Sequence, residues 1–180
     1  MSPDDALAQL RLCGLQQVEA THADDFQDYV IEVRDANATD VQMECAARIS
    51  LDSAYWLDVP EAARKTYFAH YNRLSRERNR ESARARLAEQ GLLDRLPDYV
   101  AGVTDDAAFA LELEALCGDA AKGALKSGYG PHAISPAWTA AGDYSEFQAS
   151  GEAGICLLTF AAAAGFDLYL IGNEKMVELE

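Results

Sequence analysis

Long apolar segments are scarce in this sequence. The longest run of apolar and small residues, 153–166, has about 14 residues, whereas roughly 20 are needed to cross a bilayer as a helix. The first residues also lack a basic region followed by an apolar stretch, which is the pattern of a signal peptide. We therefore expect a soluble, cytoplasmic protein with no membrane partner.

Basic residues and histidines are scarce as well. The 180 residues contain 15 Lys and Arg against 30 Asp and Glu, which gives a formal net charge of −15 at pH 7. A surface with this balance repels phosphate, so we expect no nucleic acid as a general partner. The three histidines, His22, His70 and His132, do not have the spacing of metal ligands, and we expect no metal site.

The motifs that identify common enzymes are missing. The sequence contains no H-E-x-x-H and no G-x-S-x-G, and residues 128–131 lack both G-x-G-x-x-G and the Lys-Ser/Thr pair of phosphate-binding loops. Acidic pairs are too numerous to single out a catalytic dyad. We therefore expect no cofactor, and the sequence leaves open whether the protein is an enzyme.

Cysteine is infrequent, and its spacing matches no common metal site. The four cysteines, Cys13, Cys45, Cys117 and Cys156, are widely separated and form no C-x-x-C motif. Each of them lies in an apolar context. Free cysteine behaves as a small apolar residue in protein cores, so this pattern predicts four buried thiols. A metal site and disulfides are the alternatives.

Local signals predict where several helices begin and end. Ser2, Thr39 and Thr104 are each followed by acidic residues or a capping-box glutamine, as at helix N-termini. Residues 152–164 are almost all apolar and predict a buried helix, which Gly165 should end.

Strand signals are fewer and shorter than helix signals. Residues 18–22 and 29–34 predict two strands, joined by an acidic turn into a hairpin. Residues 166–171 predict a third strand, which should join the hairpin because two strands alone are only marginally stable. The sequence therefore predicts one globular α+β domain over 1–180. It is mostly helical, with five to seven helices and a small, mainly antiparallel sheet of two to three strands.

A basic stretch in the middle of an acidic chain is the most unusual feature. Pro60 suits the first turn of a helix, and residues 64–95 carry nine basic and four acidic residues, a net charge of +5. At about 100° per residue, one stripe of this helix contains four arginines: Arg73, Arg76, Arg80 and Arg84. A continuous helix over 61–90 would be about 45 Å long. Such a helix should break within 75–84, expose its polar middle, or be covered by a second chain.

Two interpretations of the arginine stripe are open. It can be a solvated helix face with ion pairs such as Arg73 with Glu77, each contributing about 0.2–0.5 kcal/mol. It can also be a docking surface for a carboxylate- or phosphate-bearing partner, which the choice of arginine over lysine favours. The second interpretation predicts an interaction or regulatory protein whose partner is another protein or a second copy of itself.

A turn-rich loop, 127–138, carries the alternative hypothesis. Tyr129, His132 and Trp138 lie close together in it, and such loops often carry function. Under this hypothesis the protein is a small-molecule binder or an enzyme with a pocket beneath the loop, and His132 is the acid–base or ligand-binding group. The simpler interpretation is a rigid connector whose aromatic residues pack on the core.

A second aromatic cluster occupies Tyr55, Trp56 and Leu57. We expect the helical face that starts at Val41 to continue as far as Trp56. The cluster is then part of the core or the floor of a pocket.

Overall fold

The computed structural model describes residues 1–23, 28–125, 130–135, 138 and 144–170. These residues form five α-helices and a small three-stranded mixed sheet, which confirms the predicted α+β class. The chain divides into two compact units, Met1–Glu77 and Arg78–Glu180, and each has its own apolar core. The expectation of one globular domain over 1–180 stays a prediction.

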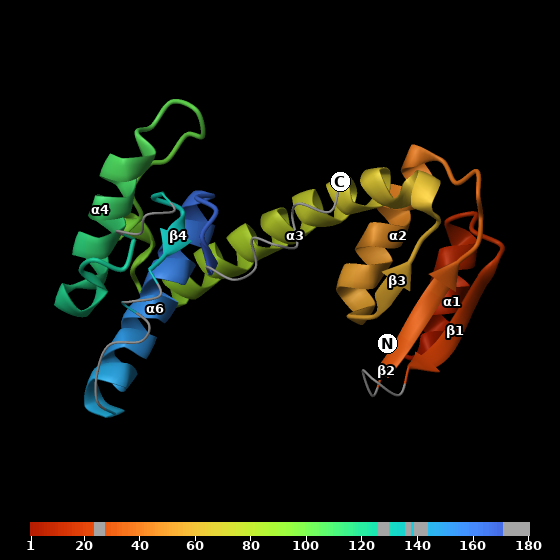
Figure 1. Cartoon of the computed structure of the whole chain (residues 1–180), viewed down its shortest axis with the longest axis horizontal. Coiled ribbons are helices and arrows are strands. Elements are labelled where there is room, and N and C mark those ends of the chain that lie inside the picture. The colour runs from red at the N-terminus through yellow and green to blue at the C-terminus, as the bar shows by residue number, and fades with distance from the viewer. Residues whose placement is uncertain (24–27, 126–129, 136–137, 139–143, 171–180) are drawn as a thin grey trace. The chain divides into compact units, whose positions relative to one another are not determined.

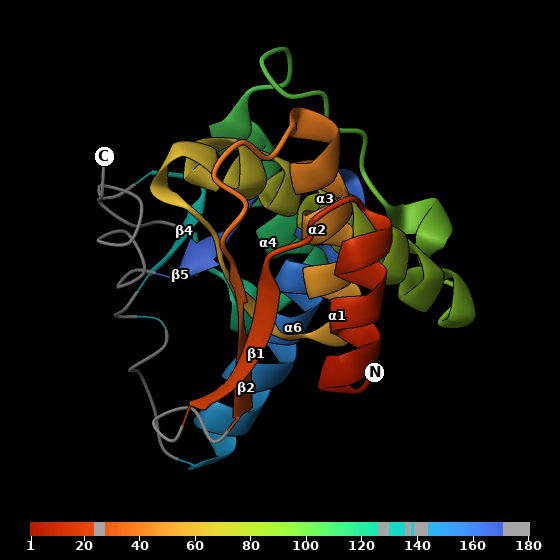
Figure 2. The same cartoon turned by 90° about the vertical axis from the view of Figure 1, so that its right-hand side faces the viewer.

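The first unit packs two helices on one face of a three-stranded sheet (Figures 1 and 2). Its elements are α1 (Pro3–Leu12), β1 (Val18–Ala23), β2 (Asp28–Val33), α2 (Asp40–Ser53), β3 (Trp56–Asp58) and the first part of α3 (Glu61–Glu89). β1 and β2 pair antiparallel, as predicted, and β2 and β3 pair parallel in the order β1-β2-β3. The sheet is therefore mixed, because α2 acts as the crossover that a parallel pair requires.

Helix starts in this unit are where the capping signals predict them. The backbone N–H of Asp5 donates to Ser2 Oγ at 3.2 Å, and the Asp5 carboxylate accepts from the Ser2 backbone N–H. Thr39 and Gln42 form the same reciprocal pair at the start of α2. These bonds satisfy backbone donors that the first helical turn leaves without partners.

The end of α2 differs from the sequence-based expectation. The helix ends at Ser53, and Ala54 takes a left-handed conformation with φ of 63°. Trp56 therefore lies in β3 instead of on a helix, and the supposed core residue Val41 is 74% exposed. The prediction of a helical face from Val41 to Trp56 was wrong because the short parallel pairing with β2 decides the conformation after Ala54.

α3 is one helix of 29 residues that begins directly after Pro60. Ala63, Tyr67 and Leu74 are buried in the core of the first unit, whereas Ala83 and Leu87 belong to the core of the second. Residues 76–82, between these two groups, are exposed. Of the three predicted outcomes for this helix, an unbroken helix with an exposed polar middle is the one observed.

The second unit is built from helices and a small pair of strands. After the last part of α3 come η1 (Leu93–Arg95), α4 (Asp106–Cys117), η2 (Asp119–Ala121), β4 (Ala133–Ile134), α6 (Tyr144–Ala164) and β5 (Tyr169–Leu170). Gly165 ends α6 with a φ of 84°, as predicted, and the backbone N–H groups of Gly165 and Phe166 both donate to the carbonyl of Ala161. The helices formed by the described residues all lack the length or the apolar character needed to cross a membrane.

β5 does not join the hairpin of the first unit. It pairs parallel with β4, with Ala133 opposite Tyr169 and Ile134 opposite Leu170. The prediction that the last strand completes the hairpin sheet was therefore wrong. β3, which lies between two helices in the sequence, takes that place and supplies the third strand that a two-stranded hairpin needs.

All four cysteines form disulfides, so the prediction of free thiols was wrong. Cys13, at the end of α1, is bonded to Cys45 in α2, and Cys117, at the end of α4, is bonded to Cys156 in α6. Each bond joins two helices of the same unit across 32 and 39 residues of sequence, respectively. The apolar context of the cysteines is correct, but their pairing depends on helix packing that spacing alone does not reveal.

Candidate functional site

A pocket lined by aromatic side chains lies in the first unit, between the end of α2, the start of β3 and the first half of α3. Its volume is about 260 Å³. Five aromatic residues line it, and no charged residue does: Tyr55, Trp56, Tyr67, Phe68 and Tyr71. We call this the aromatic pocket.

Four of the five rings of the aromatic pocket form a continuous series. The centroids of Trp56 and Phe68 are 6.2 Å apart, those of Phe68 and Tyr67 5.2 Å, and those of Tyr67 and Tyr71 6.0 Å. These distances lie in the range in which aromatic pairs attract each other. Trp56 is nevertheless 61% exposed. A large apolar side chain is therefore held in place by a neighbouring ring while much of its surface remains in contact with water.

The floor of the aromatic pocket is fixed by a small polar network. Ser50, which is only 5% exposed, donates its hydroxyl hydrogen to the carbonyl of Tyr55 at 2.8 Å. Ser50 also shares a hydrogen bond with Tyr67, and burial raises the pKa of Tyr67 to about 12. The network connects α2, the start of β3 and α3 at the pocket.

Ala54, which also lines the aromatic pocket, has a strained backbone. Its φ of 63° is the only positive φ at a residue other than glycine in the part of the chain that the structure describes. The left-handed conformation costs an alanine roughly 1–2 kcal/mol. Such strain collects at functional sites, where the surrounding structure holds it in place. Ala54 is also the C-cap of α2, and a left-handed residue commonly ends a helix.

β3 is one of the two edge strands of its sheet, with β1 at the opposite edge (Figure 1). Its backbone pairs with β2 on one side, and no backbone hydrogen bond connects residues 56–58 to another described segment. Trp56 and Asp58 are exposed, whereas Leu57 between them is buried. The aromatic pocket therefore adjoins the open edge of the sheet.

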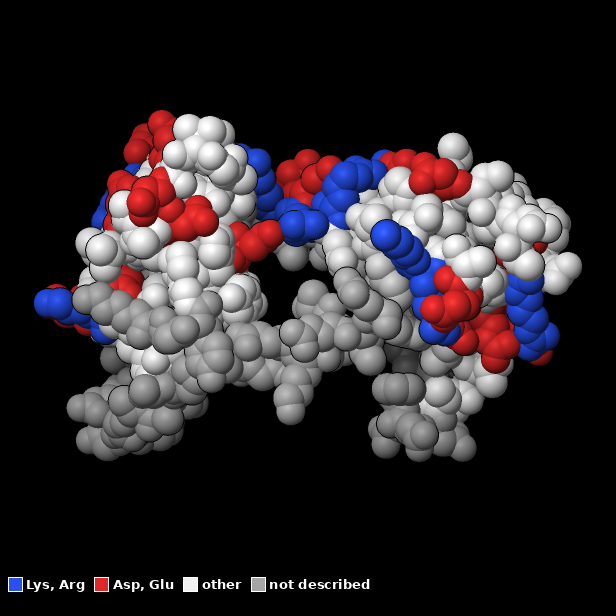
Figure 3. Space-filling model, turned by 45° about the horizontal axis from the view of Figure 1, so that its top comes forward, with Lys and Arg blue, Asp and Glu red and all other residues white. Residues whose placement is uncertain are grey.

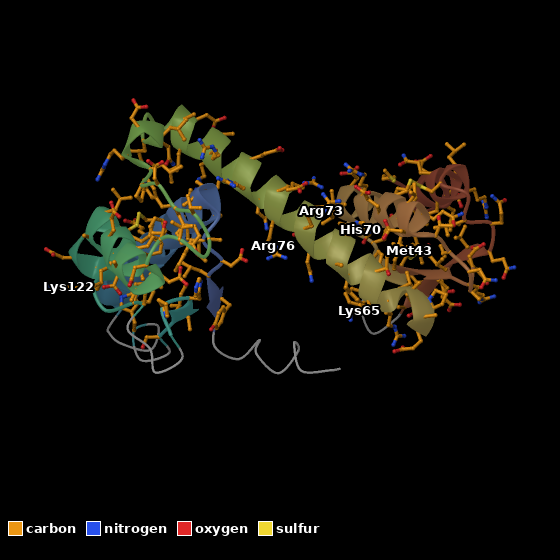
Figure 4. All side chains as sticks on the ribbon, turned by 90° about the horizontal axis from the view of Figure 1, so that it is seen from above. Met43, Lys65, His70, Arg73, Arg76 and Lys122 are labelled. Carbon is orange, nitrogen blue, oxygen red and sulfur yellow. A yellow bond between two sulfur atoms is a disulfide. The ribbon has the colours of Figure 1, made fainter. Side chains whose placement is uncertain are left out.

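The predicted arginine stripe is divided between the two units. Arg73 donates to Glu77 at 3.0 Å and to Glu44 of α2 at 2.8 Å, and Glu44 also accepts from Arg48. The hydrogen bonds from Arg48 and Arg73 lower the pKa of Glu44. Figure 4 shows Arg73 with His70 and Met43 where α3 meets α2. Arg73 thus contributes to helix packing within the first unit.

Two other arginines of the stripe contact the end of α6 in the second unit. Arg84 Nη1 donates to the carbonyl of Ala163 at 3.3 Å, and Arg80 lies against Gly165. Cations near a helix C-terminus interact favourably with its carbonyl groups. Arg76 donates through Nε to the carbonyl of Asn72, one turn earlier in α3. On the face shown in Figure 3, basic and acidic side chains are interspersed.

The residues of the 127–138 loop do not meet at a pocket in the part of the chain that is described. His132 stacks on Phe166 at 4.2 Å, and its Nε2 and Nδ1 lie 3.0 and 2.8 Å from the Asp106 carboxylate and the Asp167 carbonyl. Both ring nitrogens therefore have acceptors within the protein. Trp138 donates from Nε1 to the carbonyl of Ala120 at 2.9 Å. Tyr129 lies outside the described residues, so the pocket beneath this loop stays a prediction.

Asp106 is the centre of the polar cluster around His132. One carboxylate oxygen lies 3.0 Å from His132 Nε2, and the other accepts from the Tyr99 hydroxyl at 2.9 Å. These two hydrogen bonds, that of His132 first, lower the pKa of Asp106. Burial and the same carboxylate raise the pKa of Tyr99. The cluster ties α4, the segment before β4 and the segment after α6 together.

Sequence reasoning identified part of the aromatic pocket. Tyr55 to Leu57 were given as core or as a pocket floor; Leu57 is buried in the core, Tyr55 packs against that core, and all three residues also line the pocket. Tyr67 and Tyr71 have the same helical spacing as the buried Ala63 and Leu74. Their pattern therefore could not be separated from that of ordinary core residues. The feature of the sequence that does point to the pocket is the density of aromatic residues. Five of them fall within the 17 residues from Tyr55 to Tyr71, on both sides of Pro60, where the helix starts.

Comparisons of this chain with protein-family models, curated proteins and solved structures found no match. Within the described residues, no group of three or more His, Cys, Asp or Glu side chains is placed to hold a metal ion. The argument for a function therefore depends on the geometry of the aromatic pocket.

Proposed function

We propose that this protein is an interaction protein that holds a partner protein at the aromatic pocket of its first unit. One observation carries the proposal: Trp56 is 61% exposed beside a series of aromatic rings at the open edge of a sheet. Tryptophan and tyrosine are enriched among the residues that dominate binding energy at protein interfaces. A partner that covers these rings would remove apolar surface from water, which contributes roughly 25 cal/mol per Å².

Photo-crosslinking tests the proposal in the cells that make the protein. A photoreactive phenylalanine analogue replaces Phe68 in one variant and Val41 in a matched control. Both positions lie in the first unit, and Val41 is exposed outside the pocket. We expect a protein adduct of defined mass from the Phe68 variant alone. Equal adducts from both positions, or none from either, would contradict the proposal.

The arginine-rich face of α3 is a second candidate surface, for an anionic partner or a second copy of the chain. The exposure of residues 76–82 supports it. Arg76 and Arg78 lie in this exposed part of α3, so substituting them reverses charge there. If this surface binds, the double substitution R76E/R78E should abolish a complex that native mass spectrometry detects at low salt. The complex should also dissociate at high salt, since exposed charges are screened.

The two disulfides also bear on the compartment. The cytoplasmic location expected from the sequence went together with the expectation of free thiols, and disulfides persist mainly in oxidising compartments. We propose that the protein works where its cysteines remain oxidised. Alkylation of free thiols in intact cells, followed by mass spectrometry, should leave all four cysteines unmodified. Four alkylated cysteines would instead support the cytoplasm.

A further inference from the structure

We infer that the partner presents an extended peptide segment, which pairs as an added strand with the open edge of β3 and places an apolar side chain in the aromatic pocket. This inference rests on the proposed function, because it names the kind of partner that the same site would bind. It depends on three properties of the site: the edge strand β3, the size of the aromatic pocket, which is a socket for one side chain, and the charge around that socket.

The edge of β3 provides the backbone groups for such pairing. Among the described residues, β3 forms backbone hydrogen bonds with β2 alone. Proteins usually protect an open edge with a helix, a proline or a charge, because its free N–H and C=O groups pair readily with another chain. Peptide-binding domains use the same edge deliberately, with main-chain bonds for affinity and side-chain pockets for specificity. Here the pocket and the edge are adjacent, since Trp56 belongs to both.

The size and lining of the aromatic pocket fit one side chain. Its volume of about 260 Å³ is below the roughly 300–1,000 Å³ of pockets that enclose a small-molecule ligand. Phe68 and Tyr71 of α3, Trp56 of β3 and the preceding Tyr55 line it, and no charged group does. A leucine, phenylalanine or tryptophan of the added strand would occupy this socket, and its neighbours in that strand would point away from it.

The charge around the socket favours basic residues at both ends of the segment. Residues 1–77 contain fourteen acidic and seven basic residues, a net charge of −7. Asp58 and Glu61 follow the socket in the sequence, and both pair with Arg64, at 3.5 and 2.6 Å. Asp52 precedes it and is exposed, and Lys65 is the other cation in this turn of α3. Acidic groups thus exceed basic groups among the sequence neighbours of the pocket as well as in the whole unit.

Selection from a phage-displayed library of random nonapeptides tests the inference. The bait is the full chain with both disulfides intact, and W56A serves for counter-selection. We expect the enriched peptides to share one large apolar residue between β-branched residues, with lysine or arginine at the ends. The best peptide is then synthesised with and without N-methyl groups on its central backbone nitrogens. Because added strands bind through backbone N–H groups, we expect N-methylation to weaken binding at least tenfold.

Matched variants separate the pocket from general adhesion. W56A and F68A should each weaken binding of the unmethylated peptide at least tenfold, whereas V41A should leave it unchanged, because Val41 is an exposed apolar residue outside the pocket. Far-UV circular dichroism confirms that each variant is folded. Amide hydrogen exchange at residues 56–58 should slow when the peptide binds.

The outcomes distinguish this inference from the proposed function. Peptides that need Trp56 but tolerate N-methylation would overturn strand pairing and leave the pocket as an interaction site. If no peptide prefers the wild-type chain over W56A, an extended segment is not the occupant. A Phe68-specific crosslink would in that case still support the proposed function, with a folded surface of the partner at the pocket. The absence of that crosslink would contradict both the inference and the proposed function.

Discussion

At the scale of single residues, Tyr67 links the stability of the first unit to the aromatic pocket. Burial raises its pKa from 10.0 to about 12, so folding favours the neutral phenol. The resulting stability is fully present below pH 10 and is lost as the pH rises through about 12. A shift of this size corresponds to roughly 2–3 kcal/mol. We expect tyrosinate absorbance to show one of the eight tyrosines titrating near pH 12, and this component should vanish in Y67F. A Y67F titration curve that retains it would contradict the assignment.

Asp106 gives a second residue-scale prediction, at the acidic end of the pH range. Its folded-state pKa is lowered by the hydrogen bonds of His132 and Tyr99. A lowered pKa stabilises the folded state above the unfolded value of about 3.9, and this stability is lost as the pH falls below that value through the folded pKa. We expect D106N to lower the free energy of unfolding at pH 7 and to flatten its dependence on pH below about 4. Urea denaturation at a series of pH values measures both effects, and parallel curves for wild type and D106N would show that the cluster does not stabilise the fold.

At the scale of elements, the end of α6 depends on a side chain of α3. Arg84 donates to the carbonyl of Ala163 in the last turn of α6, where a cation also interacts with the helix dipole. We expect R84A to lower the free energy of unfolding by about 1 kcal/mol, and R86A, on the same helix, to have a smaller effect. Hydrogen exchange should show the loss at residues 160–165. Equal effects of the two substitutions would indicate that Arg84 belongs to the exposed stripe and does not cap the helix.

A comparison of individual helices and strands with their predictions shows which features of the fold can be read from the sequence. Helix starts at Ser2 and Thr39 were predicted because a cap and the helix it begins are neighbours in the chain. β3 was missed because three residues give too short a pattern, and the apolar spacing of the preceding helix extended through it. The partner of β5 was wrong because strand pairing depends on contacts distant in sequence. The aromatic pocket was found only in part, because Tyr67 and Tyr71 have the spacing of a buried helix face and look like ordinary core residues.

At the scale of the whole molecule, each compact unit has its own disulfide. Loops of 32 and 39 residues correspond to roughly 3–4 kcal/mol of stabilisation each in the chain-entropy model. We expect the double substitution C13A/C45A to accelerate hydrogen exchange mainly in residues 1–77, and C117A/C156A mainly in residues 78–170. The exchange patterns compare each variant with wild type under the same oxidising conditions. Uniformly faster hydrogen exchange along the chain in both variants would instead indicate one cooperative domain, which is what the sequence predicts.

The central claim is that the aromatic pocket holds the partner, and the dissociation constant of the complex tests it most directly. The partner recovered through the Phe68 crosslink is titrated against the wild-type chain, W56A and V41A, with both disulfides intact. We expect W56A to weaken the complex at least tenfold, about 1.4 kcal/mol, and V41A to leave the dissociation constant unchanged. Equal dissociation constants for wild type and W56A would contradict the claim.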